Sequence, residues 1–381
     1  MYMSDRTEQL NELLGLSIAA FDIPDDVYAR AVSRYEDAAH SLADFWPDGA
    51  GQIYPQGSIR LGTVTAPINP ADEYDLDWVC RRDLSKASTS QADLKEDVGY
   101  GLQRYVARQH GGMIDLHSSK RCWTLNYVGE PFHMDVLPAI PNDDEPPNAI
   151  WLTDRELRNW QPSNPIEYAE WFQLQMEAER ALLLEAIAKR MEIEQAPPSA
   201  IKTTLQRAVQ ALKRHRDIFF AAEECDGPAS IIVTTLAAGA YSPGGGLHEV
   251  LVSVTEAMPD LVERHNGKHL IKSPVSDENF ADRWNQHPER AEHFFTWIEQ
   301  AHADFAGLGA ELGMDRIVES MTSTFGEEPA RRAADQFGSR LRRTREEGKL
   351  GVRSSGLLVP AAGRAIPDHT FHGDAPRPNR P

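Results

Sequence analysis

The chain has 381 residues, of which 41% are hydrophobic and 25% charged, a composition typical of a soluble globular protein. This length is enough for two packed lobes around a shared cleft. The formal net charge of −19 argues against constitutive binding of double-stranded nucleic acid, which depends on a basic face, but it does not exclude nucleotides.

Residues 1–50 are predicted to be helical. An apolar stripe between Leu10 and Leu14 is followed by a break at Pro24, and a second helical pattern then continues to Trp46. We interpret both stripes as core packing.

Two features between residues 56 and 79 indicate a site that binds phosphate and a metal ion. Gln56-Gly57-Ser58 combines a glycine that lets the backbone approach a ligand with a hydroxyl and an amide suited to phosphate. Asp75 and Asp77 then share one face of a predicted strand whose other face carries Tyr74, Leu76, Trp78 and Cys80. Paired carboxylates favour a cation between them, and oxygen ligands favour Mg²⁺ or Mn²⁺ over Zn²⁺.

Each of these features alone has an ordinary explanation. A Gly-Ser pair is usually a turn, and an Asp-x-Asp pattern on a strand is often a solvated edge. Together, a phosphate grip followed by paired carboxylates favours a nucleotidyltransferase.

A third carboxylate, Asp135, lies in an alternating strand over residues 131–137. A strand over residues 121–127 and a short turn precede it, so a hairpin is predicted. Asp135 fits either a buried, hydrogen-bonded side chain or the third member of a metal site. We favour the second, because an adjacent strand can bring it beside Asp75 and Asp77.

Further helices are predicted over residues 94–109, 168–194 and 203–222. The last carries the basic run Lys213–Arg216, which is either a solvated helix face or part of a nucleotide site. Ser230 starts another apolar helix, where a serine either caps the helix or presents its hydroxyl and free amides to an anion.

The C-terminal region has two parts. The basic stretch 331–353 fits a solvated last helix or a basic rim near nucleotides equally well. Residues 357–381 are rich in proline and glycine and have too little apolar content for an element of their own. Phe371 interrupts this tail between two histidines, which fits either an inert end or a segment that orders on a partner.

Neither a cysteine-based disulfide or zinc site nor insertion into a membrane is expected. The three cysteines are widely spaced and contain no Cys-x-x-Cys motif. No apolar run is long enough to span a bilayer, and the N-terminus lacks a signal-peptide core. We therefore expect the protein in the cytoplasm.

These motifs resemble those of the cGAS/DncV-like nucleotidyltransferases (CD-NTases), the cyclic-oligonucleotide synthases of bacterial CBASS anti-phage defence. The resemblance spans about residues 50–300. The matching blocks are Gln56-Gly57-Ser58 with Gly62-Thr63, Asp75-x-Asp77, Asp135, Asn164-Pro165 before Trp171-Phe172, Lys213–Asp217, Ser230, and Glu278-Asn279-Phe280 before Trp284.

The resemblance implies an α/β (α+β) fold, with a polymerase β-like nucleotidyltransferase lobe built on a twisted mixed sheet and a helical C-terminal lobe. It divides the chain into N-terminal helices that bridge the lobes (1–50), the catalytic core (51–200), the helical lobe (201–353) and a flexible tail (354–381).

The resemblance also implies roles for the site residues. The catalytic, metal-binding residues would be Asp75, Asp77 and Asp135, holding two Mg²⁺ or Mn²⁺ ions. The nucleotide-binding residues would be Gln56, Gly57, Ser58, Lys213 and Ser230. The implied product is a cyclic di- or trinucleotide second messenger made from nucleoside triphosphates (NTPs), with ATP expected among the substrates.

Two other functions remain open: a nucleotidyltransferase that modifies RNA or protein, and a non-catalytic nucleotide-binding subunit of a defence complex. Retention of all three aspartates counts against the second. The resemblance also makes the tail a candidate handle for a regulatory protein, such as a HORMA-type peptide binder. Constitutive double-stranded DNA binding is not expected, because the zinc-binding insertion of the animal relatives is absent. Membrane association is not expected either, because no apolar run is long enough to span a bilayer.

Overall fold

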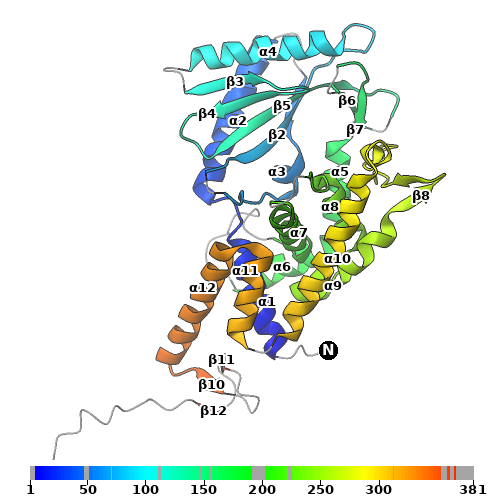
Figure 1. The fold of residues 1–381 in the computed structure, drawn as a ribbon. Helices are drawn as coiled ribbons and strands as arrows, with labels where there is room; N and C mark the ends of the chain where they lie inside the picture. The colour runs from blue at the N-terminus through cyan, green and yellow to red at the C-terminus, as the bar shows by residue number, and fades with distance from the viewer. Residues whose placement is uncertain are drawn as a thin grey trace, which may run out of the picture.

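The computed structural model describes residues 5–46, 51–69, 71–109, 113–145, 147–154, 157–190, 202–221, 225–311, 313–352, 358–360 and 364–365. A mixed sheet lies at one end of the molecule, and a larger group of helices lies below it (Figure 1). The fold is therefore the mixed α/β arrangement that the sequence predicts.

The sheet has seven strands: β1 (Gln52–Pro55), β2 (Tyr74–Arg81), β3 (Ile114–Ser118), β4 (Trp123–Tyr127), β5 (Phe132–Pro141), β6 (Ile150–Leu152) and β7 (Gln161–Ser163). The strand order is β1-β2-β5-β4-β3, with β6 paired to β5 and to β7. β2 and β5 run parallel, whereas β4 and β5 form the antiparallel hairpin predicted from their turn.

Side-chain alternation sets the two faces of the sheet. Leu76 and Trp78 of β2, and Met134 of β5, are buried beneath two helices, α2 (Asp25–Phe45) and α4 (Gln91–Arg108). Tyr35 of α2 stacks on Trp78 with ring centroids 3.7 Å apart. The predicted apolar face is thus confirmed, and it leaves the aspartates of β2 and β5 on the opposite face.

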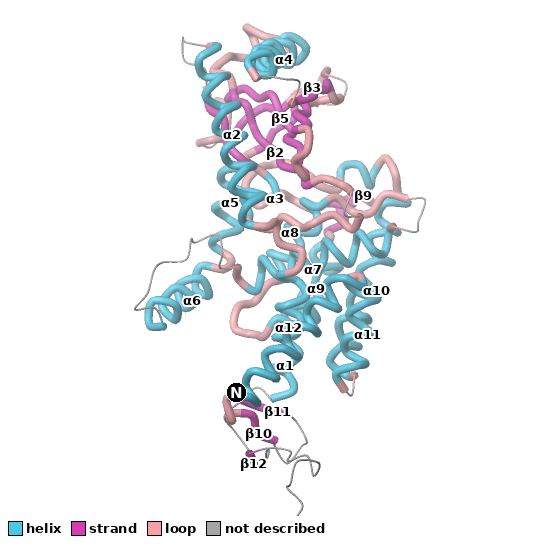
Figure 2. Tube along the Cα trace, turned by 90° about the vertical axis from the view of Figure 1, so that its left-hand side faces the viewer, coloured by secondary structure: helices cyan, strands magenta, loops and turns pink. Residues whose placement is uncertain are grey.

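The helical lobe surrounds a second apolar core. Its main helices are α1 (Asp5–Ala19), α7 (Thr204–Phe220), α8 (Ser230–Ala240), α9 (Leu247–Ala257), α10 (Glu289–Ala310), α11 (Met314–Phe325) and α12 (Glu327–Glu346). The short elements η2 (Met258–Leu261), β8 (Glu263–His265), β9 (Lys268–Leu270) and η3 (Asp282–Asn285) lie between α9 and α10. Because α1 packs in this lobe and α2 packs on the sheet, the N-terminal helices contact both cores (Figures 1 and 2).

The single helix predicted over residues 168–194 is wrong. The chain forms α5 (Pro165–Leu174) and then α6 (Glu177–Arg190), and the remainder of the predicted helix lies outside the described residues. The break turns Met176 into the helical core, where its sulfur accepts a hydrogen bond of 2.8 Å from Thr203 Oγ1. This tertiary contact overrides a helical pattern that is continuous in the sequence.

The C-terminal region differs in part from its prediction. β10 (Leu350–Val352) pairs antiparallel with β11 (Leu358–Pro360) and with β12 (Arg364–Ala365). The expectation that the tail forms no element is therefore wrong for these short strands, because strand pairing uses backbone groups and needs no long apolar run. Residues 366–381 lie outside the described part of the chain.

Residues 331–346 of the basic stretch 331–353 form the main part of α12. Arg331 and Arg332 both pair with Glu328 on the same helix, and Arg340 pairs with Glu12 of α1. These contacts favour the solvated-helix interpretation over a basic rim at the nucleotides. None of the helices within the described ranges is both long and apolar enough to cross a bilayer. The division of the chain at residues 50, 200 and 353 stays a prediction.

Candidate active site

Three aspartates meet on the open face of the sheet. In the parallel register of β2 and β5, Asp77 lies directly opposite Asp135, and Asp75 precedes Asp77 by two positions on the same face. One carboxylate oxygen from each lies within 4.8 Å of the others. Within the described part of the chain, no other set of three acidic, histidine or cysteine side chains converges in this way. The predicted triad is therefore assembled by strand pairing.

The environment of the triad makes it unfavourable for all three carboxylates to be charged without a cation. Burial raises the pKa of Asp77 to about 7, and the negative charges of Asp75 and Asp135 contribute to the rise. Arg121 and Lys213 act in the opposite direction but do not cancel it. A set of carboxylate oxygens on one sheet face fits hard divalent cations such as Mg²⁺ or Mn²⁺.

Neighbouring side chains orient the other two carboxylates. Thr124 Oγ1 donates to Asp135 at 2.5 Å, and the Cys122 thiol donates at 3.3 Å. On the exposed side, His133 Nε2 lies 3.5 Å from Asp75 Oδ1. The hydrogen bond to Asp75 raises the pKa of His133, which favours its charged form beside the acidic group.

The Gln56-Gly57-Ser58 segment lies against Asp77. Gln56 donates its backbone N–H to the Asp77 carbonyl at 3.0 Å, and the short helix α3 (Gly57–Leu61) begins at the next residue. Gly57 has φ +58, and a Cβ added there would lie 2.8 Å from Asp77 Oδ2. A glycine is therefore needed at this position for both its backbone conformation and its space.

Lys213 points from α7 toward the loop that follows α3. Its ammonium donates to the Thr63 carbonyl at 3.2 Å and to the Thr63 hydroxyl at 3.1 Å. The residue is only 5% exposed, so the interpretation of Lys213 as a solvated surface charge is wrong. Its proposed contact with a nucleotide stays a prediction, since its described partner is Thr63.

Ser230 is the first residue of α8 and is exposed. The cap position is Ala229, and no side-chain cap is formed there, so the alternative that Ser230 caps the helix is wrong. Its hydroxyl accepts a hydrogen bond of 3.0 Å from Arg216, one turn beyond Lys213 on α7. A role for Ser230 in phosphate binding also stays a prediction.

With this geometry established, similarity to known proteins identifies the family. Residues 51–138 match the family described as "Cyclic GMP-AMP synthase DncV-like, nucleotidyltransferase domain". The chain is 30% identical over 382 residues to the c-di-GMP synthase of Roseivirga ehrenbergii, an alignment that covers 97% of this chain and 99% of the relative. The chain belongs to the CD-NTase family. It is accordingly a nucleotidyltransferase of the cyclic-oligonucleotide-synthesising type.

Solved CD-NTases share the fold of this one. The structure of Bradyrhizobium diazoefficiens CdnG in complex with GTP aligns with a TM-score of 0.68 at 22% identity, covering 86% of this chain and 99% of that one. The structure of Escherichia coli CdnC in a complex with a HORMA protein aligns with a TM-score of 0.60 at 13% identity, covering 80% of this chain and 93% of that one. At these identities the likeness establishes the nucleotidyltransferase architecture.

Sequence reasoning missed several residues around the triad of this CD-NTase. Thr124 could have been found by counting the hairpin register, which places it opposite Asp135. Arg121 has no local signal, yet its charge influences both Asp77 and Glu278 of the helical lobe. Burial raises the pKa of Glu278 to about 7, and nearby Asp282 adds to the rise. In the sequence, only the block Glu278-Asn279-Phe280 draws attention to Glu278.

Lys213→Met is expected to stabilise the CD-NTase fold near neutral pH. Burial lowers the pKa of Lys213 to about 7, and the charge of Arg216 adds to this shift, so folding must desolvate or deprotonate the ammonium. The destabilisation is fully present below about pH 7 and disappears as the pH rises past about 10.4, the pKa of an unfolded lysine. Thermal unfolding measured across this range should show the variant more stable at low pH and equal to the parent at high pH.

The matched control is Lys272→Met, because the Lys272 side chain is 65% exposed. It should show no pH-dependent difference in melting temperature. A Lys213→Met protein that melts below the parent at about pH 6 would mean that the two bonds to Thr63 outweigh the cost of burying the charge.

Proposed function

We propose that this CD-NTase joins two nucleoside triphosphates into a cyclic dinucleotide, with GTP as a substrate and two divalent metal ions at the triad. The observation that carries the proposal is the convergence of Asp75, Asp77 and Asp135 on one sheet face beside Gly57. Support for guanine comes from the relative named c-di-GMP synthase and from CdnG, whose structure contains GTP. ATP remains the second candidate substrate.

The chemistry would be an in-line displacement carried out twice. An acceptor hydroxyl attacks the α-phosphorus of a triphosphate, a new phosphodiester forms, and pyrophosphate leaves. Repeating the step between the two ends of the linear intermediate closes the ring. When bound, two divalent ions would polarise the α-phosphate and offset the charge of the departing pyrophosphate.

The residues of the chain would divide the remaining tasks. Asp75 and Asp77 would hold both ions, and Asp135, oriented by Thr124, would ligate one of them and accept the proton of the attacking hydroxyl. The backbone at Gly57 and the hydroxyl of Ser58 would hold the triphosphate on the side of the sheet. Lys213 and Ser230 would face it from the helical lobe.

The reaction is tested by incubating the protein with four labelled NTPs and Mg²⁺ or Mn²⁺, singly and in combination. Products are treated with phosphatase and identified by mass spectrometry. We expect GTP alone to yield a phosphatase-resistant cyclic dinucleotide, because a ring has no terminal phosphate. Chelation of the metal should abolish the product.

Other outcomes separate the alternatives. A ladder of phosphatase-sensitive linear oligomers would favour an enzyme that extends RNA. Transfer of label to a protein would favour a protein-modifying enzyme. No incorporation with any nucleotide or metal would favour a non-catalytic subunit.

We also propose a role in CBASS anti-phage signalling in the cytoplasm, with a regulatory protein engaging the C-terminal tail. CdnC has been solved as a complex with a HORMA protein, so a protein with this fold can dock such a partner. The comparison that tests this role is a pull-down from the native host with the full chain and with a chain truncated after Ser355. Identical sets of bound proteins would mean that the tail recruits no partner.

A further inference from the structure

The loop after α3 is held by a row of donors on one face of α7. Gln206 Nε2 donates to the Leu61 carbonyl at 2.9 Å, and Gln210 Nε2 donates to the Val64 carbonyl at 2.7 Å. Lys213, seven residues beyond Gln206, completes the row through its two bonds to Thr63. Positions i, i+4 and i+7 share one helix face, so the three side chains form a ladder that follows the loop.

This ladder connects the two lobes. The opposite face of α7 is buried in the helical core, through Leu205, Ala208, Val209, Ala211 and Leu212. The N-terminus of α7 is fixed by Thr203, whose hydroxyl and backbone form a capping box with Gln206. The donors are therefore presented from a rigid support. Their acceptors are the carbonyls of Leu61, Thr63 and Val64 and the hydroxyl of Thr63, at the end of α3 and in the loop that leads to β2 of the sheet.

From the loop the contacts continue to the triad. Thr63 donates its backbone N–H to the Ser58 carbonyl at 2.9 Å, which closes the α3 turn on itself. Gly57, next to Ser58, is the residue whose missing Cβ makes room for Asp77 Oδ2. Lys213 is thus connected to the triad through Thr63, Ser58 and the segment that ends at Gln56, which donates its backbone N–H to the Asp77 carbonyl.

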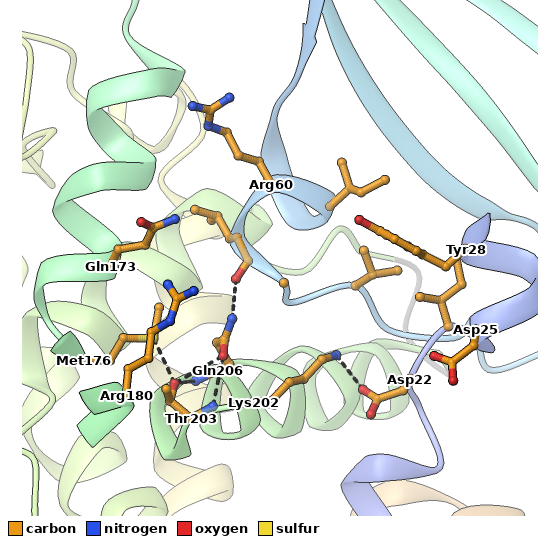
Figure 3. Close-up of a pocket in the computed structure, with 15 residues that line it drawn as sticks. Asp22, Asp25, Tyr28, Arg60, Gln173, Met176, Arg180, Lys202, Thr203 and Gln206 are labelled. Carbon is orange, nitrogen blue, oxygen red and sulfur yellow. Dashed lines mark hydrogen bonds and ion pairs between the residues drawn. The ribbon is translucent and has the colours of Figure 1, made fainter. Parts of the chain in front are cut away.

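Leu61, Thr63 and Val64 are buried, and a cavity of about 440 Å³ lies between this segment and the start of α7. It is bounded by residues 59–62 and Val64 on one side and by Thr203 and Gln206 on the other. Figure 3 shows Gln206 reaching across from α7, with Lys202 paired to Asp22 nearby. Asp22 also accepts a hydrogen bond of 2.9 Å from Gln210. Beside this cavity, the polar contacts from Gln206 and Gln210 set the distance between α7 and the loop.

We propose that Gln206 and Gln210 are positioning residues for nucleotidyl transfer. Through the loop 61–64 they set the α3 turn, and hence Gly57 and Ser58, at the correct distance from Asp77. They act without touching the nucleotide. This inference rests on the proposed function, because it assigns the α3 turn to the triphosphate.

The test uses Gln206→Glu in the full chain. A glutamate keeps the acceptor of the capping box but cannot donate to the Leu61 carbonyl. We expect kcat to fall by about 10-fold or more, since misplacing reacting groups by a fraction of an ångström is costly. The Kd for GTP, measured separately, should stay within about threefold of the parent value, because Gln206 makes no contact with the nucleotide in the ground state. Amide hydrogen exchange should rise over residues 57–64.

Two further variants keep the test decisive. Gln210→Met removes the hydrogen bond to the Val64 carbonyl while keeping a similar side-chain volume. It is expected to lower kcat as well, and it replaces Gln206→Glu if that variant does not fold. Gln103→Glu is the matched control, because Gln103 is exposed on α4, away from the loop. It should change neither kcat nor exchange.

Three results would overturn the inference: a kcat within about twofold of the parent in folded Gln206→Glu and Gln210→Met, unchanged exchange over residues 57–64, or a loss of GTP affinity as large as the loss of kcat. If the parent protein itself makes no product, the proposed function fails, and hydrogen exchange still shows whether the ladder holds the loop.

Discussion

Asp77→Asn is expected to lower the rate of product formation by about 1,000-fold or more, because it removes a charged ligand from the centre of the triad. Asp77 has Asp75 two positions before it on the same face of β2 and Asp135 directly opposite on β5, and the charges of both contribute to its raised pKa. An amide of the same shape preserves the packing against Gly57 but lacks the negative charge that a divalent ion requires.

The same substitution should leave the metal-free fold intact or slightly more stable. A raised carboxyl pKa means that the folded state resists ionisation, so the destabilisation grows as the pH rises from about 4, the pKa of an unfolded aspartate, and is fully present above about 7. Asparagine removes that cost. Melting temperatures at about pH 8 without metal should therefore be equal to or above those of the parent.

Asp115→Asn is the control for Asp77→Asn, because Asp115 is an exposed aspartate on β3 of the same sheet. It should retain full turnover. Near-normal turnover by folded Asp77→Asn protein would contradict the assignment of the triad.

Gly57→Ala is expected to lower turnover by about 100-fold. The new methyl group would sit 2.8 Å from Asp77 Oδ2, so either the carboxylate or the α3 turn has to move. Alanine is also disfavoured at φ +58, which adds about 1 kcal/mol of backbone strain. Turnover and melting temperature measured together separate the two effects.

Gly129→Ala is the control for Gly57→Ala, because it measures the effect of backbone strain on stability without a new side-chain contact. Gly129 has φ +84 in the turn between β4 and β5, and a Cβ added there meets nothing within 4 Å. The control should therefore lose stability by a similar amount and retain turnover. Equal turnover in the two alanine variants would mean that close contact with Asp77 has no part in catalysis.

Local patterns were sufficient to predict the two faces of β2 and the hairpin of β4 and β5. Alternation along β2 identified Asp75 and Asp77 on one face, because the two-residue period of a strand has no alternative solution once one face is buried. The approach of Asp135 to this pair was favoured as one of two alternatives, and the strand order and the parallel pairing of β2 with β5 were not predicted.

Other features depend on contacts between distant segments, which a single sequence does not contain. The break between α5 and α6 follows from the burial of Met176 beneath Thr203. The burial of Lys213 follows from the approach of the loop at Thr63, whereas its helical position alone left a solvated face and a nucleotide site both open. The strands β11 and β12 need β10 as a partner before their short segments can be extended.

Because β2 and β5 pair in parallel, the chain between them has to pass through α4 and the β3–β4 hairpin before Asp77 can meet Asp135. Closing such a long loop is entropically costly, whereas the helices and the hairpin form from near neighbours in the sequence. During refolding from denaturant, secondary structure should therefore appear first. The acidic site is expected to be among the last parts of the molecule to assemble, so the recovery of activity should lag behind the recovery of helix content.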